Sequence, residues 1–165
     1  LTAPSVSLEG KSLWIAQSLP VRPQEVLRAK LRLHMLLTVI PELFCSVCVC
    51  ILFRPDFVTG LLCVVLPIVF TLFIAAFGLV INLKKPNLNW QTEAIAVKQS
   101  IGVLIAMLGG WVIAAVLGVG YYLLYAKLGS IAFLALAIVV LAALAAVELK
   151  WISSRGSEID RKTHV

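Results

Sequence analysis

Glu42 is the side chain in this sequence that is best placed to do chemistry, because it lies inside a long apolar run. An ionisable group within a membrane-spanning segment is costly, and it commonly marks a transport pathway or a specific partner. The residue before it is Pro41, which has no N–H and frees a backbone carbonyl one turn earlier. Glu42 is therefore a pathway candidate. The alternatives are a carboxylate that snorkels to a boundary, or one that hydrogen-bonds a helix end freed by Pro41.

Two other patterns match fragments of known sites, but their surroundings argue against those sites. Cys45 and Cys48 have the C-x-x-C spacing of zinc and redox sites, yet a thiol within an apolar run stays protonated and behaves as a small hydrophobe. The Gly-Lys-Ser triplet at 10–12 has Ser5 where a phosphate-binding loop needs glycine. We also find no hydrolytic triad and no paired carboxylates. The sequence therefore predicts no metal site and no enzyme in this chain.

Four long apolar runs must position these residues. The chain is 61% hydrophobic and 13% charged, whereas soluble domains are near half apolar and a quarter charged. A run of about 20 apolar residues spans a bilayer as a helix, and four such runs would overfill the core of a soluble chain of this length. The sequence predicts an all-α, polytopic membrane protein. Its transmembrane domain covers 33–149, with spans at about 33–53, 57–83, 100–126 and 130–147, and a tail follows at 150–165.

The basic residues predict the orientation of the chain in the membrane. Lys and Arg are enriched in cytoplasmic loops. Of the 14 Lys and Arg residues, only Arg54 and Lys127 lie in the first and third gaps between spans, and the rest flank the other ends of the spans. Both termini are therefore expected in the cytoplasm. The net charge of +6 then reflects membrane topology and contact with anionic lipid rather than nucleic-acid binding.

The segment before the first span is expected to form a short amphipathic helix over 5–19. Leu8, Ile15 and Leu19 fall on one side at helical spacing, and Pro20 ends the helix. Pro23 suits the first turn of the next helix, where its missing N–H costs nothing. A helix over 23–53 would be about 45 Å long, which exceeds a bilayer by several turns. The sequence thus predicts a surface helix, an elbow and a long entry helix.

Small residues recur every four positions in the third span. Such spacing lets two helix backbones approach closely, so it predicts a packing seam, with the Ala-rich fourth span as the expected neighbour. The alternatives are the general enrichment of Gly and Ala in membrane helices, and a kink at Gly109 and Gly110. The residues of the seam are Gly102, Ala106, Gly110, Ala114 and Gly118.

The stretch LEGKSLWIAQSLPVRPQEVLRAKL at 8–31 resembles the cytoplasmic segment between the second and third membrane helices of ABC-2 type transporter permeases. The stretches INLKKPNLNWQTEAIAVKQS and WISSRGSEI are similar to those of a group of bacterial ABC exporter permeases. The resemblance implies that this chain is the C-terminal portion of a six-helix unit. The first residue is Leu rather than Met, so we expect this sequence to be the C-terminal part of a longer chain. Whether residues before Leu1 supply further membrane helices stays open on the sequence.

The resemblance also implies how such a protein works. Residues 1–32 would form a coupling helix and an elbow, and the coupling helix would rest in a groove of a separate ABC ATPase subunit in the bacterial plasma membrane. ATP and Mg²⁺ would bind that subunit, so this chain would hold no cofactor. A second permease copy or half would complete the exporter. The residues implied in coupling are Glu9, Gly10, Lys11, Leu13, Trp14, Leu19, Pro20, Arg22, Pro23 and Glu25.

Two other functions stay open on the sequence. A stand-alone, proton-coupled exporter of the small multidrug type would use Glu42 as its membrane carboxylate, although such a protein does not need the basic segment at 1–32. A membrane scaffold or sensor would depend neither on Glu42 nor on ATP. In both cases the helix at 5–19 would lie on lipid without a protein partner.

Overall fold

The computed structural model describes residues 23–84 and 101–156, and all of these except 54–56 are helical. Four helical segments are long and apolar enough to cross a membrane: Glu25–Phe53, Phe57–Lys84, Gly102–Leu124 and Lys127–Ser154. The all-helical class and the four apolar helices are therefore confirmed. The elements, in chain order, are α2 (Pro23–Phe53), α3 (Phe57–Lys84), α5 (Ile101–Trp151) and the short π-helix η2 (Ile152–Gly156). The amphipathic helix predicted at 5–19 lies outside the described residues.

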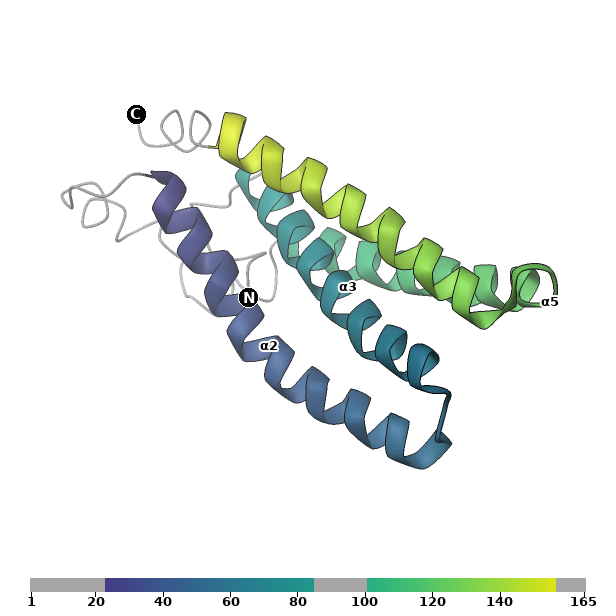
Figure 1. Cartoon of the computed structure of the whole chain (residues 1–165). Helices are drawn as coiled ribbons and strands as arrows, with labels where there is room; N and C mark the ends of the chain where they lie inside the picture. Colours follow the sequence, from purple (N-terminus) through teal and green to yellow (C-terminus); the bar gives the residue numbers. More distant parts are fainter. Residues whose placement is uncertain (1–22, 85–100, 157–165) are drawn as a thin grey trace.

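Helix α5 is a hairpin of two membrane-length arms rather than one rod (Figure 1). The backbone leaves the helical conformation at Gly129, where φ is 75° and ψ is 165°. That conformation is open essentially to glycine alone. The chain therefore reverses direction between the first arm (Gly102–Leu124) and the second arm (Lys127–Ser154), at the gap predicted between the third and fourth spans. Gly109 and Gly110 keep helical backbone angles, so they do not break the first arm.

The connection between α2 and α3 is only three residues long and is capped at both sides. Arg54 adopts a left-handed conformation (φ 47°), and its N–H donates to the carbonyl of Cys50 at 3.0 Å. Pro55 cannot continue the helix, as is common just after a helix end. The carbonyl of Asp56 accepts from the N–H of Gly60 at 2.8 Å and begins α3. This tight turn returns α3 alongside α2 in the opposite direction.

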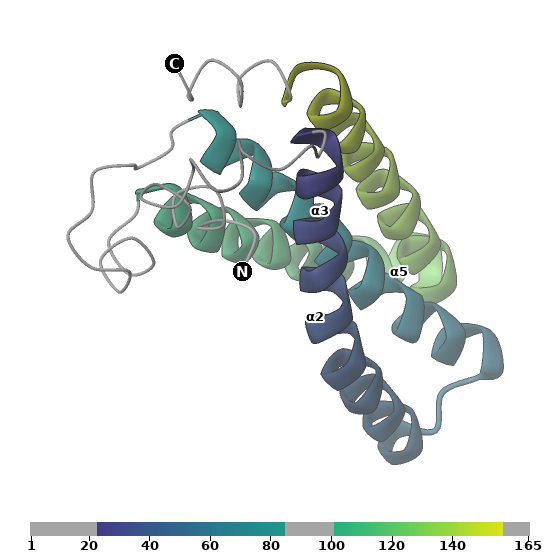
Figure 2. The ribbon, with the colours of Figure 1, turned by 90° about the vertical axis from the view of Figure 1, so that its left-hand side faces the viewer.

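Helix α3 is central and contacts both α2 and α5 (Figures 1 and 2). One apolar cluster forms where α3 meets the second arm of α5, around Phe73, Leu141 and Ala145. A second cluster joins three elements at one end of the bundle, and its buried members are Leu27, Ala76, Leu79, Leu83 and Ile152. The chain is therefore held together mainly through the faces of α3.

Large apolar side chains cover the outer surface of the bundle. On α2, Ile40, Phe44 and Leu52 are 66%, 72% and 76% exposed, and the most apolar stretch of this helix contains no buried residue. Trp111 on the first arm of α5 is 74% exposed. Contiguous apolar surface of this extent is unusual for a soluble monomer. It suits contact with lipid or with another membrane subunit.

The helices extend further than the apolar runs that predicted them. α2 begins at Pro23, the residue expected to start it, and the fourth span continues to Ser154 instead of ending near residue 147. The reason is that backbone hydrogen bonding does not stop where the hydrocarbon stops. Polar residues such as Glu148 and Lys150 lie on the last turns of the same helix.

Candidate functional site

One end of the bundle collects the start of α2 and the ends of α3 and α5. Leu27, Leu83 and Ile152 come from three different elements and are buried in one cluster there. We call this the basic end, because most described cations lie on its turns. The opposite end of the bundle contains two turns: Arg54 lies in the turn between α2 and α3, and Lys127 lies at the turn between the two arms of α5. The cations of the basic end are Arg28, Lys30, Arg32, Lys84 and Lys150.

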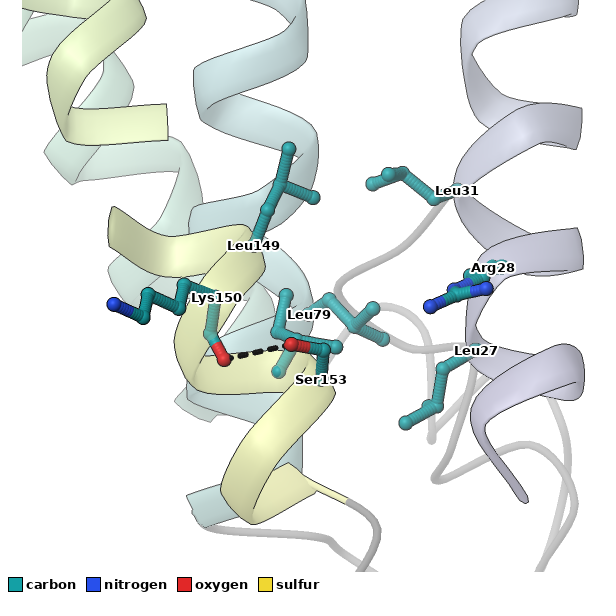
Figure 3. A pocket seen from close by; sticks show the side chains of 8 residues that line it. Leu27, Arg28, Leu31, Leu79, Leu149, Lys150 and Ser153 are labelled. Carbon is teal, nitrogen blue, oxygen red and sulfur yellow. Dashed lines mark hydrogen bonds between the residues drawn. The ribbon is translucent and has the colours of Figure 1, made fainter. Parts of the chain in front are cut away.

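A groove of about 440 Å³ opens at the basic end between α2 and the last turns of α5 and η2 (Figure 3). Leu79 of α3 lines it between the two sides. Arg28 projects from α2 toward the groove, whereas the ammonium of Lys150 points away from α2. The hydroxyl of Ser153 donates to the carbonyl of Lys150 at 2.9 Å. The groove thus combines apolar walls with one guanidinium at its α2 side.

The ends of α3 and α5 are also joined by a cation and an aromatic ring. The ammonium of Lys84 lies 5.3 Å from the ring centroid of Trp151, within the range of a cation–π interaction. Asn82, two residues earlier on α3, is 1% exposed. The structure therefore buries Asn82 in protein near the end of α3. Trp and Lys together are typical of a membrane–water interface.

Glu42 lies near the middle of α2, half-buried against α3. The Thr71 hydroxyl is 2.9 Å from one carboxylate oxygen and 3.1 Å from the other. Both residues are about three turns or more from the ends of their helices. The pair therefore lies at mid-depth of the apolar segments. Sequence reasoning found Glu42 but not Thr71, which is 29 residues away and belongs to another helix.

Two local features of α2 lie within about one turn before Glu42. Pro41 removes one hydrogen bond of the helix at this level. One turn earlier, the Thr38 hydroxyl donates to the carbonyl of His34 at 2.7 Å. Such back-bonding by Thr commonly bends a helix. The hydrogen bond found for Glu42 goes to a side chain of the neighbouring helix.

The small residues of the first arm of α5 do not all face one neighbour. Gly102 and Ala106 are buried, whereas Ala114 and Gly118 are exposed. A Cβ on Gly110 would lie 3.3 Å from Ile74 of α3, and a Cβ on Gly118 would meet no atom within 4 Å. Every fourth position drifts about 40° around a helix, so the stripe winds out of the contact. The neighbour at Gly110 is α3, whereas the sequence favoured the fourth span.

Gly109 approaches α3 more closely than Gly110 does, and the predicted stripe did not include it. A Cβ there would lie 2.7 Å from the ring of Phe77. Phe77 stacks on Phe73 with ring centroids 5.9 Å apart, so its ring has little room to move. In the sequence, the adjacent glycines at 109 and 110 were the feature that could have indicated this close approach.

A second cavity, of about 340 Å³, lies toward the opposite end between α3 and the two arms of α5. Gly118, Leu66 and Phe133 contribute to its mostly apolar lining. Tyr121 packs edge-to-face on Phe133 across 5.4 Å. Nothing in this lining carries a charge at neutral pH.

The cysteines carry free thiols on α2 and α3. Cys45 and Cys48 are exposed, and the thiol of Cys50 lies 3.8 Å from the carbonyl of Gly60. Over residues 23–84 and 101–156, no group of three His, Cys, Asp or Glu side chains is placed to hold a metal ion. Cys50 thus contacts the first turn of α3, whereas Cys45 and Cys48 lie on the surface of α2.

Most of the residues implied in ATPase coupling precede the described part of the chain. The structure describes neither Glu9, Gly10, Lys11, Leu13 and Trp14, nor Leu19, Pro20 and Arg22. Pro23 is the first residue of α2, and Glu25 lies exposed in its first turn, where a carboxylate favours the helix dipole.

No protein-family model, no curated protein and no solved structure matches this chain. The function is therefore inferred from the helices and side chains described above.

Proposed function

We propose that this chain is the membrane-spanning permease subunit of an ATP-driven, ABC-2 type exporter, which docks a separate ATPase subunit through residues 7–19. One observation carries the proposal: α2 starts at Pro23, directly after the stretch that resembles a coupling helix, and continues unbroken for 31 residues. A push on that stretch would therefore act on a helix long enough to cross the membrane.

The packing of the basic end supports transmission of such a push. Leu27, about one turn into α2, is 2% exposed and belongs to the cluster that contains Leu83 of α3 and Ile152 of η2. Side chains that are buried in one cluster pass a displacement on through their direct contacts. Tilting the start of α2 would therefore move the ends of α3 and α5 with it. Rigid-body movement of this kind is a common way to couple distant sites.

The charge distribution supports an orientation with the basic end in the cytoplasm. Basic residues are retained on the cytoplasmic side of membrane proteins. The described basic end carries Arg28, Arg32 and Lys150, and the opposite turns carry Arg54 and Lys127. In this orientation the start of α2 and the ends of α3 and α5 lie on the side of the ATPase. The chain would thus be a multi-pass protein of the bacterial plasma membrane.

Each group of residues then has a role in the exporter. Leu13 and Trp14 anchor the coupling helix in the ATPase groove, as buried aromatic and apolar side chains often do. Glu9, Lys11 and Arg22 form the polar rim of that contact. ATP and Mg²⁺ are bound by the ATPase subunit. A second permease copy or half packs against the exposed apolar surface and completes the translocation pathway.

The docking is tested by co-purification. The full-length protein is co-expressed with a candidate ABC ATPase subunit from the same genome and captured through a tag on this chain. We expect the ATPase to co-purify, and to be lost when Leu13→Ala and Trp14→Ala are combined. The matched control combines Leu108→Ala and Trp111→Ala, which removes a Leu and a Trp that are 50% and 74% exposed on α5. Failure of the unchanged chain to capture the ATPase, or its capture by the double variant at 13 and 14, would refute the docking.

The Glu42–Thr71 contact favours a second candidate, the stand-alone proton-coupled exporter. A carboxylate held at mid-depth is the element that such a mechanism needs. Here Glu42→Gln would abolish efflux driven by a proton gradient without an ATPase, whereas the ABC mechanism requires the ATPase and tolerates loss of the gradient. A scaffold would be insensitive to Glu42→Gln and to the double variant at 13 and 14.

A further inference from the structure

We propose that the groove at the basic end binds one anionic phospholipid, with its phosphate at Arg28 and an acyl chain between α2 and the last turns of α5. This inference rests on the membrane location of the four helices. It does not depend on the transport role.

The walls of the groove suit an acyl chain. Leu27 and Leu31 line its α2 side, Leu149 and Ile152 line the side of α5 and η2, and Leu79 of α3 lies between them. The volume of about 440 Å³ is within the range of pockets that hold small ligands. A groove with these walls gains from apolar contact, which a free soluble anion cannot provide.

The charge of the groove suits a phosphodiester. Arg28 projects toward the space, and it forms no ion pair or hydrogen bond with the described residues. A guanidinium can bind two phosphate oxygens at once. Ser153 on the opposite wall adds a hydroxyl, which here donates to the Lys150 carbonyl. Among the residues that the structure describes, no Asp or Glu lines the groove.

The position of the groove fits a lipid rather than another occupant. It lies at the level of the Lys84–Trp151 contact, the pair that is typical of a membrane–water interface. Basic pockets between membrane helices on the cytoplasmic side are suited to anionic headgroups. The two walls come from the first and last described helices, so a bound lipid would tie the start of α2 to the end of α5.

The test is native mass spectrometry of the full-length protein in detergent, with added phosphatidylglycerol or phosphatidylcholine of identical acyl chains. We expect one tightly held phosphatidylglycerol and weaker binding of phosphatidylcholine. Arg28→Gln should weaken the binding of phosphatidylglycerol about fivefold, which is the loss expected when one basic residue near a membrane surface is removed. Arg28→Lys should keep most of the binding. Leu31→Trp should reduce binding of both lipids by filling the groove.

The control is Arg32→Gln, which removes an exposed arginine one turn further along α2 that does not line the groove. It should leave lipid binding unchanged. Equal losses of lipid binding with Arg28→Gln and Arg32→Gln would mean that the lipid is attracted by the overall positive charge rather than bound in the groove. That result would overturn the proposal. So would equal binding of the two lipids, or full displacement by inorganic phosphate, which would identify a soluble anion. Unchanged binding in Leu31→Trp would place the lipid elsewhere and would also overturn it.

Discussion

The hydroxyl of Thr71 lies 2.9 Å and 3.1 Å from the two carboxylate oxygens of Glu42, so its single proton is shared between them. This contact joins α2 to α3 at a depth where the surroundings are apolar. A polar group there must find its partner within the protein, because lipid offers none. On the outer half of α2 the large side chains of Val47, Ile51 and Leu52 are exposed. The Glu42–Thr71 pair is therefore a specific link in a part of α2 that is otherwise loosely packed.

Replacing Thr71 with Val should lower the free energy of unfolding by about 1 kcal/mol, the usual size of such a bond between membrane helices. Valine keeps the shape and removes the donor. Thr71→Ser keeps the donor and should retain most of the stability. Unfolding by a denaturing detergent in mixed micelles measures the difference. Equal stability of the Val and Ser variants would show that the hydrogen bond contributes nothing.

Replacing Gly109 with Ala should destabilise the contact between α3 and α5. The new Cβ would lie 2.7 Å from the Phe77 ring, and overpacking of this kind costs about 1–3 kcal/mol. Gly118→Ala in the same arm is the control, because its Cβ meets no atom within 4 Å. That variant should be neutral or gain up to about 1 kcal/mol of helix propensity. Thermal unfolding that ranks the two variants the other way would contradict the packing described for α3.

Gly129→Ala should be destabilising although nothing lies within 4 Å of its Cβ position. The reason is backbone strain alone, since φ 75° with ψ 165° is costly for any other residue, about 1–3 kcal/mol. The same measurement with Gly118→Ala separates this strain from a general effect of losing glycine. A Gly129→Ala protein as stable as the unchanged chain would mean that the hairpin turn has a different backbone.

Leu141→Ala should cost about 2 kcal/mol or more, because Leu141 is 2% exposed in the cluster with Phe73 and its loss leaves a cavity. Leu144, one turn further along the same arm, is 46% exposed, and Leu144→Ala should change stability little. Detergent unfolding of the two variants provides the comparison. Similar losses for both would show that this face of α5 is not packed on α3.

Single cysteines at Lys127 and Lys150 should report the orientation of the bundle. In a background without the four native cysteines, Lys127→Cys should react with a membrane-impermeant maleimide in intact cells. Lys150→Cys should react only after the cells are permeabilised, since basic ends stay in the cytoplasm. The reverse pattern would place the basic end outside and would remove the basis for ATPase docking.

Much of the fold follows from the sequence, because its strongest signals are local. Apolar runs of membrane length located the four helices, since the cost of exposing a backbone to lipid depends on the run itself. Pro23 marked the start of α2, because proline acts on its own backbone, and the gaps between the apolar runs marked the two turns. The separation of basic residues at the two ends follows from the same boundaries.

The pairing of the helices was decided by the tertiary structure. Three features depend on how the helices are rotated and crossed. They are the contact of Glu42 with Thr71, the close approach at Gly109 rather than at Ala114 or Gly118, and the burial of Asn82. These helices are apolar on every side, so no polar stripe in the sequence distinguishes the lipid-facing side from the packed side. Side-chain shape and single hydrogen bonds set the rotation instead. For the same reason only the folded chain places Arg28 beside the end of α5 and forms the groove between them.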